Sequence, residues 1–91
     1  MENNEAIKQR MIKEGFSIIN VYDDVANEVF PDHQHPGDQL LVVIRGSISI
    51  EMDGKISVLK AGDEMFFPAN IIHSAKIDPE GCLYIDGEKP I

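Results

Sequence analysis

Hydrophobic and polar residues alternate with a period of two through the middle of the chain. This is the pattern of half-buried β-strands, whose successive side chains point to opposite faces of a sheet. Residues 47–52 and 55–59 show the alternation most clearly, and Asp53-Gly54 between them is typical of a two-residue hairpin turn. The pattern therefore predicts an antiparallel hairpin here. The inward-facing side chains of its first strand would be Ile48, Ile50 and Met52.

Further short apolar segments follow one another along the chain, separated by turn residues at intervals of about eight positions. The expected strands cover residues 16–22, 28–30, 39–45, 47–52, 55–59, 64–67, 71–77 and 82–85. Gly46 would end the strand 39–45, residues 78–81 would form a turn, and residues 87–91 would form a loose tail. Many short strands at this spacing predict an all-β sandwich or barrel.

A helical pattern precedes the strands, at about residues 4–14. Asn3 or Asn4 can cap its first turn, and Gly15 is suited to end it in the left-handed conformation. The apolar face of this helix would consist of Ile7 and Met11. So short an apolar face does not support a helix in isolation, so the helix must pack against the rest of the protein.

The apolar run at residues 40–44 is continuous rather than alternating. A strand of this kind is buried on both of its faces. We expect one face to line the core and the other to contact a second subunit. The run therefore predicts a homodimer.

Composition limits the number of domains and the kinds of partner. A chain of 91 residues is expected to form one domain, 1–91. Its net charge of −8 provides no basic surface for phosphates, which argues against nucleic acid or an anionic membrane as a partner. The single cysteine, Cys82, fits a reducing compartment. No apolar run is long enough to span a membrane, and the acidic N-terminus is unlike a signal peptide, so we expect a cytoplasmic protein.

Three histidines and one glutamine are the candidate metal ligands. His33 and His35 lie two residues apart, which places them on the same face of an extended segment. Gln39 follows them, and His73 lies in a later expected strand. Imidazole nitrogens and amide oxygens can both bind metal ions. From residue type alone, other roles stay open: a pair of exposed loop histidines, a polar residue at a strand start, and a hydrogen-bonded, partly buried histidine.

The spacing of these residues closely resembles that of the cupin superfamily. The first cupin motif has the form Gly-x5-His-x-His-x(3,4)-Glu-x6-Gly. In this chain the matching residues are Asn27, five residues, His33-Gln34-His35, three residues, Gln39, six residues and Gly46.

The second cupin motif has the form Gly-x5-Pro-x-Gly-x2-His-x3-Asn. Here the chain has Gly62, five residues, Pro68-Ala69-Asn70, two residues, His73, three residues and Ile77. The two motifs together span residues 27–77, over half of the chain, with every spacing intact.

The resemblance implies a small, single-domain cupin: a jelly-roll β-barrel over about residues 16–86, with a short N-terminal helix. It also implies a divalent transition metal ion in the mouth of the barrel. The implied ligands are His33, His35, Gln39 and His73. This donor set suits Fe, Ni, Zn, Mn or Cu. A small molecule is the expected partner at such a site.

Three departures from the motifs affect the expected site. Asn27 and Asn70 stand where the motifs have Gly, and Asn is the residue besides Gly that most readily adopts the left-handed conformation. Gln39 replaces Glu, so the ligand set would be neutral and would leave the full +2 charge on the site. We expect a stronger Lewis acid that favours anionic ligands and binds its metal less tightly.

Strand parity gives a first picture of the pocket wall. Leu41, Val43 and Arg45 would share the face of Gln39, and Ala75 and Ile77 that of His73, although the end of a strand favours a solvated Arg45. Additional candidates for the wall are Phe30, Phe66 or Phe67, Met52, Met65 and Tyr84.

These expectations lead to several candidate functions. The first is a metal-dependent enzyme of isomerase, lyase or hydrolase type, acting on a small anionic or carbonyl-containing metabolite, because cupins with the Gln variant resemble such proteins. The alternatives are a metal-dependent dioxygenase, a non-catalytic module that binds a small molecule or a metal, and a purely structural metal. The sequence identifies no general base. Tyr22 and Tyr84 carry phenols that could act as acid or base.

Overall fold

The computed structural model describes residues 2–91 as one helix followed by six strands. The elements are α1 (Asn4–Lys13), β1 (Ile18–Asp24), β2 (Val29–His33), β3 (Gln39–Met52), β4 (Lys55–Lys60), β5 (Glu64–Phe67) and β6 (His73–Glu88). Neighbouring strands are antiparallel throughout. The predicted N-terminal helix and the mostly β architecture are confirmed. No helix within residues 2–91 is long and apolar enough to cross a membrane.

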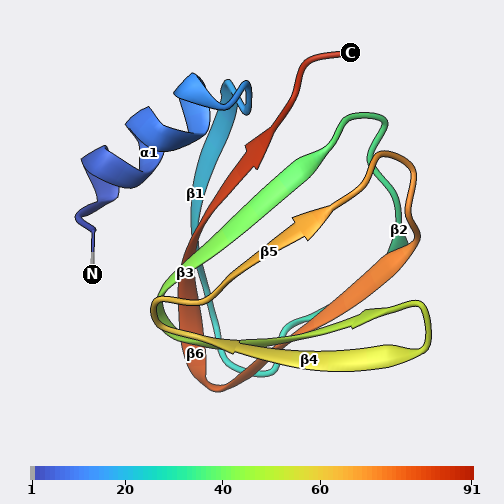
Figure 1. Ribbon diagram of the computed structural model, residues 1–91. Coiled ribbons are helices and arrows are strands. Elements are labelled where there is room, and N and C mark those ends of the chain that lie inside the picture. Colours follow the sequence, from blue (N-terminus) through green and yellow to red (C-terminus); the bar gives the residue numbers. More distant parts are fainter. Residues whose placement is uncertain (1) are drawn as a thin grey trace.

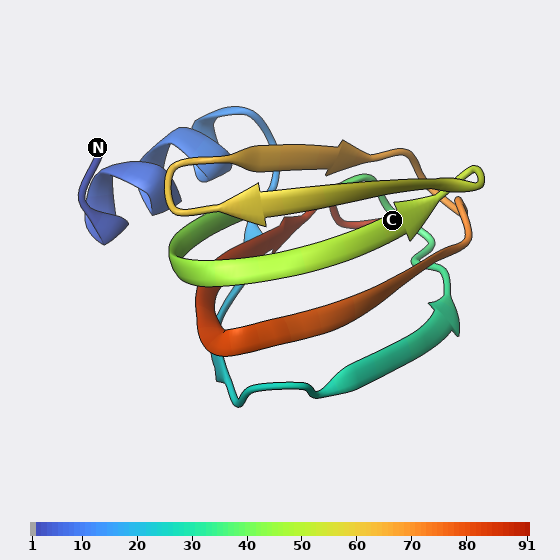
Figure 2. The same ribbon diagram turned by 90° about the horizontal axis from the view of Figure 1, so that it is seen from below.

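The two longest strands, β3 and β6, pair with each other along both of their halves. The first half of β3 also pairs with β5, and the second half of β6 pairs with β1, which makes one layer. The second half of β3 pairs with β4, and the first half of β6 pairs with β2, which makes the other layer. Figure 2 shows β2, β6, β3 and β4 side by side in this second layer. Two antiparallel layers joined in this way form the predicted jelly-roll barrel.

Gly46 and Gly81 lie where β3 and β6 pass from one layer to the other. Both have positive φ angles, +78° and +77°, and the pairing of the two strands shifts register on either side of Gly46. The prediction that Gly46 ends a strand and that residues 78–81 form a turn is therefore wrong. Both strands continue through these glycines and bend there, because Gly adopts left-handed backbone angles without strain.

The main core lies between the two layers. Ile48 and Ile50 point into it, as the alternation predicts, and Met52 packs partly buried against it. The predicted two-residue hairpin turn at Asp53-Gly54 is confirmed. These residues have φ angles of +55° and +73°, as a tight hairpin turn requires.

Helix α1 lies outside the barrel, against the layer formed by β1, β3, β5 and β6 (Figure 1). A second cluster of buried side chains joins it to the strands: Ile7, Met11, Phe16, Leu40, Val42 and Ile85. The outer face of the run 40–44 is thus covered by the chain's own helix. The expectation that a second subunit covers this face is wrong, because the one-turn apolar face of α1 is large enough to bury Leu40 and Val42.

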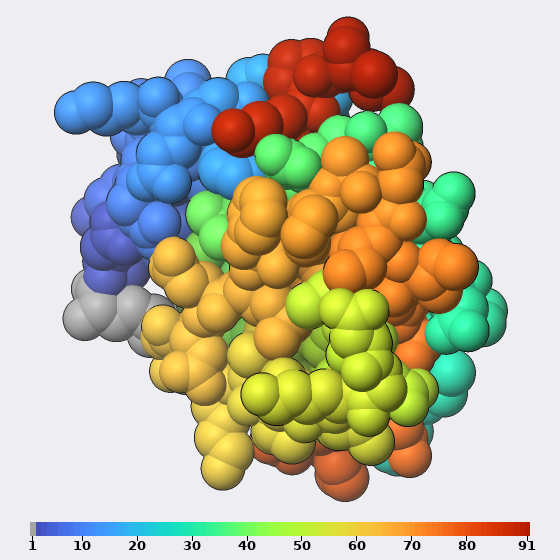
Figure 3. Space-filling view, turned by 45° about the vertical axis from the view of Figure 1, so that its right-hand side comes forward, coloured from blue at the N-terminus to red at the C-terminus, as the bar shows by residue number. Residues whose placement is uncertain are grey.

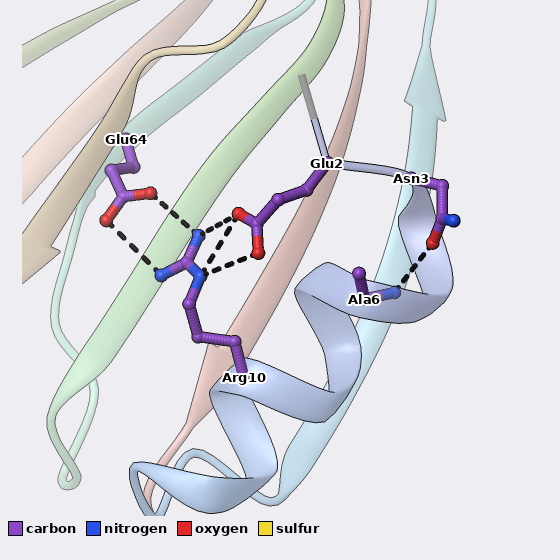
Figure 4. A network of polar contacts seen from close by, with 5 residues as sticks. All are labelled: Glu2, Asn3, Ala6, Arg10 and Glu64. Atoms are coloured by element: carbon purple, nitrogen blue, oxygen red, sulfur yellow. Dashed lines mark hydrogen bonds and ion pairs between the residues drawn. The ribbon is translucent and has the colours of Figure 1, made fainter.

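The ends of α1 form as the sequence predicts. Oδ1 of Asn3 accepts a hydrogen bond from the backbone N–H of Ala6 at 2.8 Å, which caps the first turn (Figure 4). At the other end, Gly15 has a φ of +96° and Phe16 N–H donates to the carbonyl of Met11 at 2.8 Å. This return bond is the Schellman arrangement, and it directs Phe16 back onto the helix.

Arg10 ties the exposed side of α1 to the barrel. Its Nη2 lies 2.9 Å from Oε2 of Glu64 on β5 and 3.1 Å from Oε1 of Glu2 (Figure 4). The pKa of Arg10 is raised, first by the hydrogen bond to Glu2, against an opposing effect of burial. These groups are partly exposed to solvent, so the pairs orient the helix more than they stabilise it.

Met11 belongs to the buried cluster that joins α1 to the strands, so removing its side chain should weaken the packing of the helix on the barrel. Met11 is fully buried, whereas its neighbour Ile12 is 48% exposed. We expect Met11→Ala to lower the free energy of unfolding by about 2–3 kcal/mol. Ile12→Ala, the matched control, should change it by less than about 0.5 kcal/mol. Urea denaturation of both variants checks this, and equal losses would contradict the role given to Met11.

Candidate metal centre

Strand pairing brings together His33 and His73, the first and the last of the candidate ligands along the chain. β2 ends at His33 and β6 begins at His73, and the two residues are direct partners in the antiparallel register. His35 follows β2 in the connecting loop, and Gln39 is the first residue of β3. All four side chains line one cavity of about 150 Å³ inside the mouth of the barrel.

The three imidazole rings are close enough to share one ion. The ring centroids of His33 and His73 are 4.3 Å apart, and His35 lies 5.2 Å and 5.4 Å from them. One nitrogen from each ring lies within 4.8 Å of the others. Nitrogens bound to one metal at about 2.1 Å are separated by at most about 4.2 Å. The rings therefore need only a small adjustment to meet at a metal.

Backbone carbonyls fix the orientation of two of the rings. Nδ1 of His33 lies 2.7 Å from the carbonyl oxygen of Pro31, and Nδ1 of His73 lies 3.2 Å from that of Ile71. A carbonyl oxygen only accepts hydrogen bonds, so each Nδ1 must carry the proton. In a neutral ring this leaves the lone pair on Nε2, the atom then available to a metal.

A carboxylate does the same for the third ring. Nδ1 of His35 lies 2.9 Å from Oε1 of Glu88 near the end of β6, and both side chains are partly buried. A carboxylate that holds the far nitrogen of a metal-binding imidazole fixes its tautomer and raises its basicity. All three imidazoles thus have Nδ1 occupied and Nε2 unassigned.

Gln39 presents an acceptor that has no partner. Its Nε2 donates to Oδ1 of Asp86 at 2.5 Å, and both side chains are only 6% exposed. Its Oε1 is buried without a hydrogen bond, a situation found for no other side-chain nitrogen or oxygen within residues 2–91. Buried acceptors normally have a donor. Three Nε2 lone pairs and this oxygen offer acceptors alone, and a metal cation would satisfy all four, so the donor set fits the metal.

The negative charge around the site differs from the sequence-based expectation of a full +2 charge. Asp86 contacts Gln39 and Glu88 contacts His35, so carboxylates touch two of the four candidate ligands. A carboxyl group therefore lies one hydrogen bond away from Gln39. With a metal bound, these carboxyl groups would reduce the expected gain in Lewis acidity and the expected loss of metal affinity.

Burial sets the protonation of the site's ionisable groups. It lowers the pKa of His73, partly offset by the hydrogen bond to Ile71, so this ring is neutral at neutral pH as a metal ligand must be. Burial likewise raises the pKa of Asp86, against the opposing effect of the Gln39 hydrogen bond.

The two tyrosines that line the cavity are also affected by burial. It raises the pKa of Tyr22 and, far more, that of Tyr84, whose hydroxyl donates to Oδ2 of Asp24 at 2.6 Å. Both phenols stay protonated at neutral pH.

The loop that carries His35 is held at three points. The carbonyl of His35 accepts from Asn70 N–H at 2.7 Å, Asp38 Oδ1 accepts from Ala69 N–H at 2.8 Å, and the Asp38 carbonyl accepts from Lys89 N–H at 2.8 Å. Figure 3 shows the C-terminal residues, in red, against this green segment. The tail predicted to be loose therefore belongs to the site: β6 reaches Glu88, and Lys89 holds the ligand loop.

The turn asparagines also adopt the conformation that the sequence predicts. Asn27 and Asn70 both have a φ of +64°. Left-handed Asn residues thus replace the glycines of the motifs, and in Asn70 this conformation directs the N–H toward the His35 carbonyl.

The cavity wall agrees in part with the parity prediction. Apart from the candidate ligands it consists of Tyr22, Phe30, Leu41, Ile48, Ile50, Phe67, Ala75, Tyr84 and Asp86. Phe67 rather than Phe66 faces inward, and its ring packs 4.4 Å from that of His73. Arg45 lies outside and pairs with Asp23 at 3.1 Å, because the register shift after Val43 reverses the parity of the strand.

Sequence reasoning missed two acidic residues of the site, Asp86 and Glu88. Both lie beyond the last strand that the sequence predicts, residues 82–85. Their signal was the spacing of Tyr84, Asp86 and Glu88 at every second position, which puts the three on one face if the strand continues.

Comparison with known proteins agrees with this geometry. Comparison with the curated proteins gave no significant match. Among solved structures, the chain is similar to an RmlC-like cupin from Shewanella frigidimarina NCIMB 400, with 30% identity over 80% of this chain and 67% of that one and a TM-score of 0.67. A protein of unknown function from Streptococcus pyogenes shows 24% identity over 80% and 64% of the two chains, with a TM-score of 0.69.

The chain is also similar in fold to an enzyme. The DMSP lyase DddQ from Ruegeria pomeroyi DSS-3 superposes with a TM-score of 0.74 and 22% identity, over 79% of this chain but 37% of the lyase. This chain thus spans well under half of that enzyme's length. The family model of the cupin domain matches residues 21–88, which include every candidate ligand. With three-quarters of its length matched and both layers of the jelly roll in place, the chain belongs to the cupin family.

Proposed function

We propose that this protein is a metal-dependent enzyme of isomerase, lyase or hydrolase type, which acts on a small carbonyl-containing or anionic metabolite. The observation that supports it most is that three imidazole rings, with one nitrogen of each within 4.8 Å of the others, line one cavity together with Gln39, whose Oε1 has no hydrogen-bond partner. That cavity also has room for a small molecule beside these atoms. A purely structural metal would need no such space.

His33, His35, Gln39 and His73 would hold the metal ion. When bound, the metal would polarise a carbonyl or carboxylate oxygen as a Lewis acid. Asp86 lines the cavity and provides the carboxylate that can accept a proton from a bound molecule. Two phenols also line the cavity. The hydroxyl of Tyr84 already donates to Asp24, so Tyr22 is the phenol that can donate a hydrogen bond to a bound molecule.

The wall of the cavity limits the substrate. Its volume of about 150 Å³ is below the usual range for drug-sized ligands, so the substrate is a small metabolite. No lysine or arginine occurs among the residues that line it. A negatively charged group on the substrate would therefore bind at the metal, and the apolar side chains of Phe30, Leu41 and Ile48 would contact the rest.

The activity can be tested on protein freed of metal by chelation and reloaded separately with Fe(II), Ni(II), Zn(II), Mn(II) or Cu(II). Small keto acids, unsaturated sugar acids and DMSP form the first substrate panel. DMSP is included because a lyase named for it shares this fold. Reactions are followed by NMR, without and with oxygen. We expect turnover of a carbonyl compound in the absence of oxygen, only with metal.

The other outcomes of this experiment separate the alternatives. Turnover that requires oxygen would indicate a dioxygenase. Tight binding of a panel compound without any reaction would favour a non-catalytic binding module. Protein that takes up none of the five metals would contradict the proposal as a whole.

The homodimer stays a prediction of the sequence and takes no part in this chemistry. The apolar strand on which it was based is covered by α1. Apolar side chains do remain exposed elsewhere on the barrel, at Val29, Ile56, Val58 and Ile72. Light scattering at several concentrations tests the prediction, and a monomer at the highest of them would contradict it.

A further inference from the structure

Asp86 is the one carboxylate that contacts the only amide among the four candidate ligands. We propose that Asp86 is a positioning residue, which holds the Gln39 amide with Oε1 toward the three imidazoles and thereby strengthens metal binding. This inference rests on the metal site of the proposed function. Its basis is the 2.5 Å hydrogen bond from Gln39 Nε2 to Asp86 Oδ1, between two side chains that are almost fully buried.

The need for such a residue follows from the symmetry of an amide. The two ends of the Gln39 side chain have nearly the same shape, so packing alone does not distinguish an oxygen from an NH₂ group directed at the site. With the amide reversed, its N–H groups would face the ion, and its oxygen would face a carboxylate. A carboxylate is an acceptor on both oxygens, so it selects the orientation in which the NH₂ group points to it.

The position of Asp86 in the fold makes this selection strict. Gln39 begins β3 and is flanked by β5 and β6, through the pairs Gln39–Phe67 and Gln39–Glu88. The Gln39 side chain lines the cavity, where its NH₂ group donates to Asp86. The hydrogen bond is to a charged acceptor in a buried place, which makes it stronger than a neutral one.

The test compares wild-type protein with Asp86→Asn and with a control, Asp78→Asn. An asparagine at position 86 can donate or accept, so it no longer selects one orientation of Gln39. Asp78 also lies on β6, but its carboxylate accepts hydrogen bonds from Ser47 and Ser49 away from the cavity. Both variants remove one negative charge. Zn(II) affinity is measured by competition with a chromophoric chelator, independently of any enzyme activity.

We expect Asp86→Asn to weaken Zn(II) binding about 10–100-fold, and Asp78→Asn to leave it within about twofold of wild type. Selective ¹³C and ¹⁵N labelling of glutamine gives the second measurement, because chemical shifts report the orientation directly. In wild type, the Gln39 side-chain carbonyl should shift on adding Zn(II), and in Asp86→Asn this shift should be reduced. Before zinc is added to wild type, one Gln39 amide proton should lie downfield and exchange slowly.

Each result decides the inference. If wild type binds zinc and Asp86→Asn binds it equally well, Asp86 has no positioning role and the site itself stands. If affinity falls but the carbonyl shift is unchanged, charge alone explains the loss and positioning is wrong. If Asp86→Asn does not fold, the wild-type amide protons decide, and equal, fast-exchanging protons overturn the inference. If wild type binds no zinc, the comparison is repeated with Ni(II), Mn(II), Fe(II) and Cu(II), and failure to bind any of the five metals overturns both the proposed site and this role.

Discussion

The His73→Ala variant is expected to lose metal binding and, with it, the proposed activity. His73 is the most buried of the three histidines, at 4% exposure, and the ring of Phe67 packs against it at 4.4 Å. It is also the only ligand candidate that comes from the far end of the chain, so no neighbouring side chain can replace it. We expect metal affinity to fall by more than the roughly 10–100-fold that loss of a supporting residue causes.

Thermal unfolding with and without metal measures this loss. A ligand that binds only the folded protein raises its stability by about 2.7 kcal/mol at a concentration 100 times the dissociation constant. Wild type should therefore melt at a higher temperature when metal is added, and His73→Ala should not. Ser74→Ala, at the next position of β6, is the control and should keep the metal response. An unchanged response in His73→Ala would refute the metal site.

The largest loss of stability is expected from Gly46→Ala. A Cβ at this position would meet the carbonyl oxygen and carbon of Gly81, both backbone atoms, well inside van der Waals contact. The φ of Gly46, +78°, adds the strain of a left-handed backbone. We expect a loss of more than about 4 kcal/mol, which leaves little of the stability of a small domain.

Gly54→Ala separates the two causes. Gly54 has a similar φ, +73°, but no atom lies within 4 Å of the position of an added Cβ. Its replacement should cost only the backbone strain, about 1–2 kcal/mol. Urea denaturation compares the two variants. Equal losses would mean that the close approach of β3 and β6 at Gly46 does not matter.

Local pattern was enough to predict much of this fold and site. The period of two at residues 47–52 identified Ile48 and Ile50 as core residues, since a side chain's face depends only on parity within a regular strand. The spacing of the two motifs identified the four side chains that line the cavity. The left-handed turns were predictable because Asn27 and Asn70 tolerate positive φ at low cost.

Features that depend on pairing between distant strands were not predictable in the same way. The parity rule fails at Arg45 because a register shift intervenes, and the shift is visible only when β6 is in place. A glycine within an apolar segment has the same sequence pattern whether the strand ends there or bends, so the sequence predicts a strand end at Gly46 and a turn at Gly81 where the strands in fact continue. The role of Asp86 depends on its contact with Gln39, forty-seven positions earlier in the chain.

Both ends of β6 reach the same side chain, His35, although the strand is 16 residues long. Fully extended, it would reach about 50 Å, whereas the longest dimension of the whole molecule is 32 Å. His73 at its start and Glu88 at its end both meet His35, one ring against ring and the other through a hydrogen bond. A metal ion bound to His35 and His73 would hold the two ends of the bent strand β6 close to each other. Straightening β6 at Gly81 would then require release of the ion, so metal affinity and the stiffness of the barrel would be thermodynamically linked.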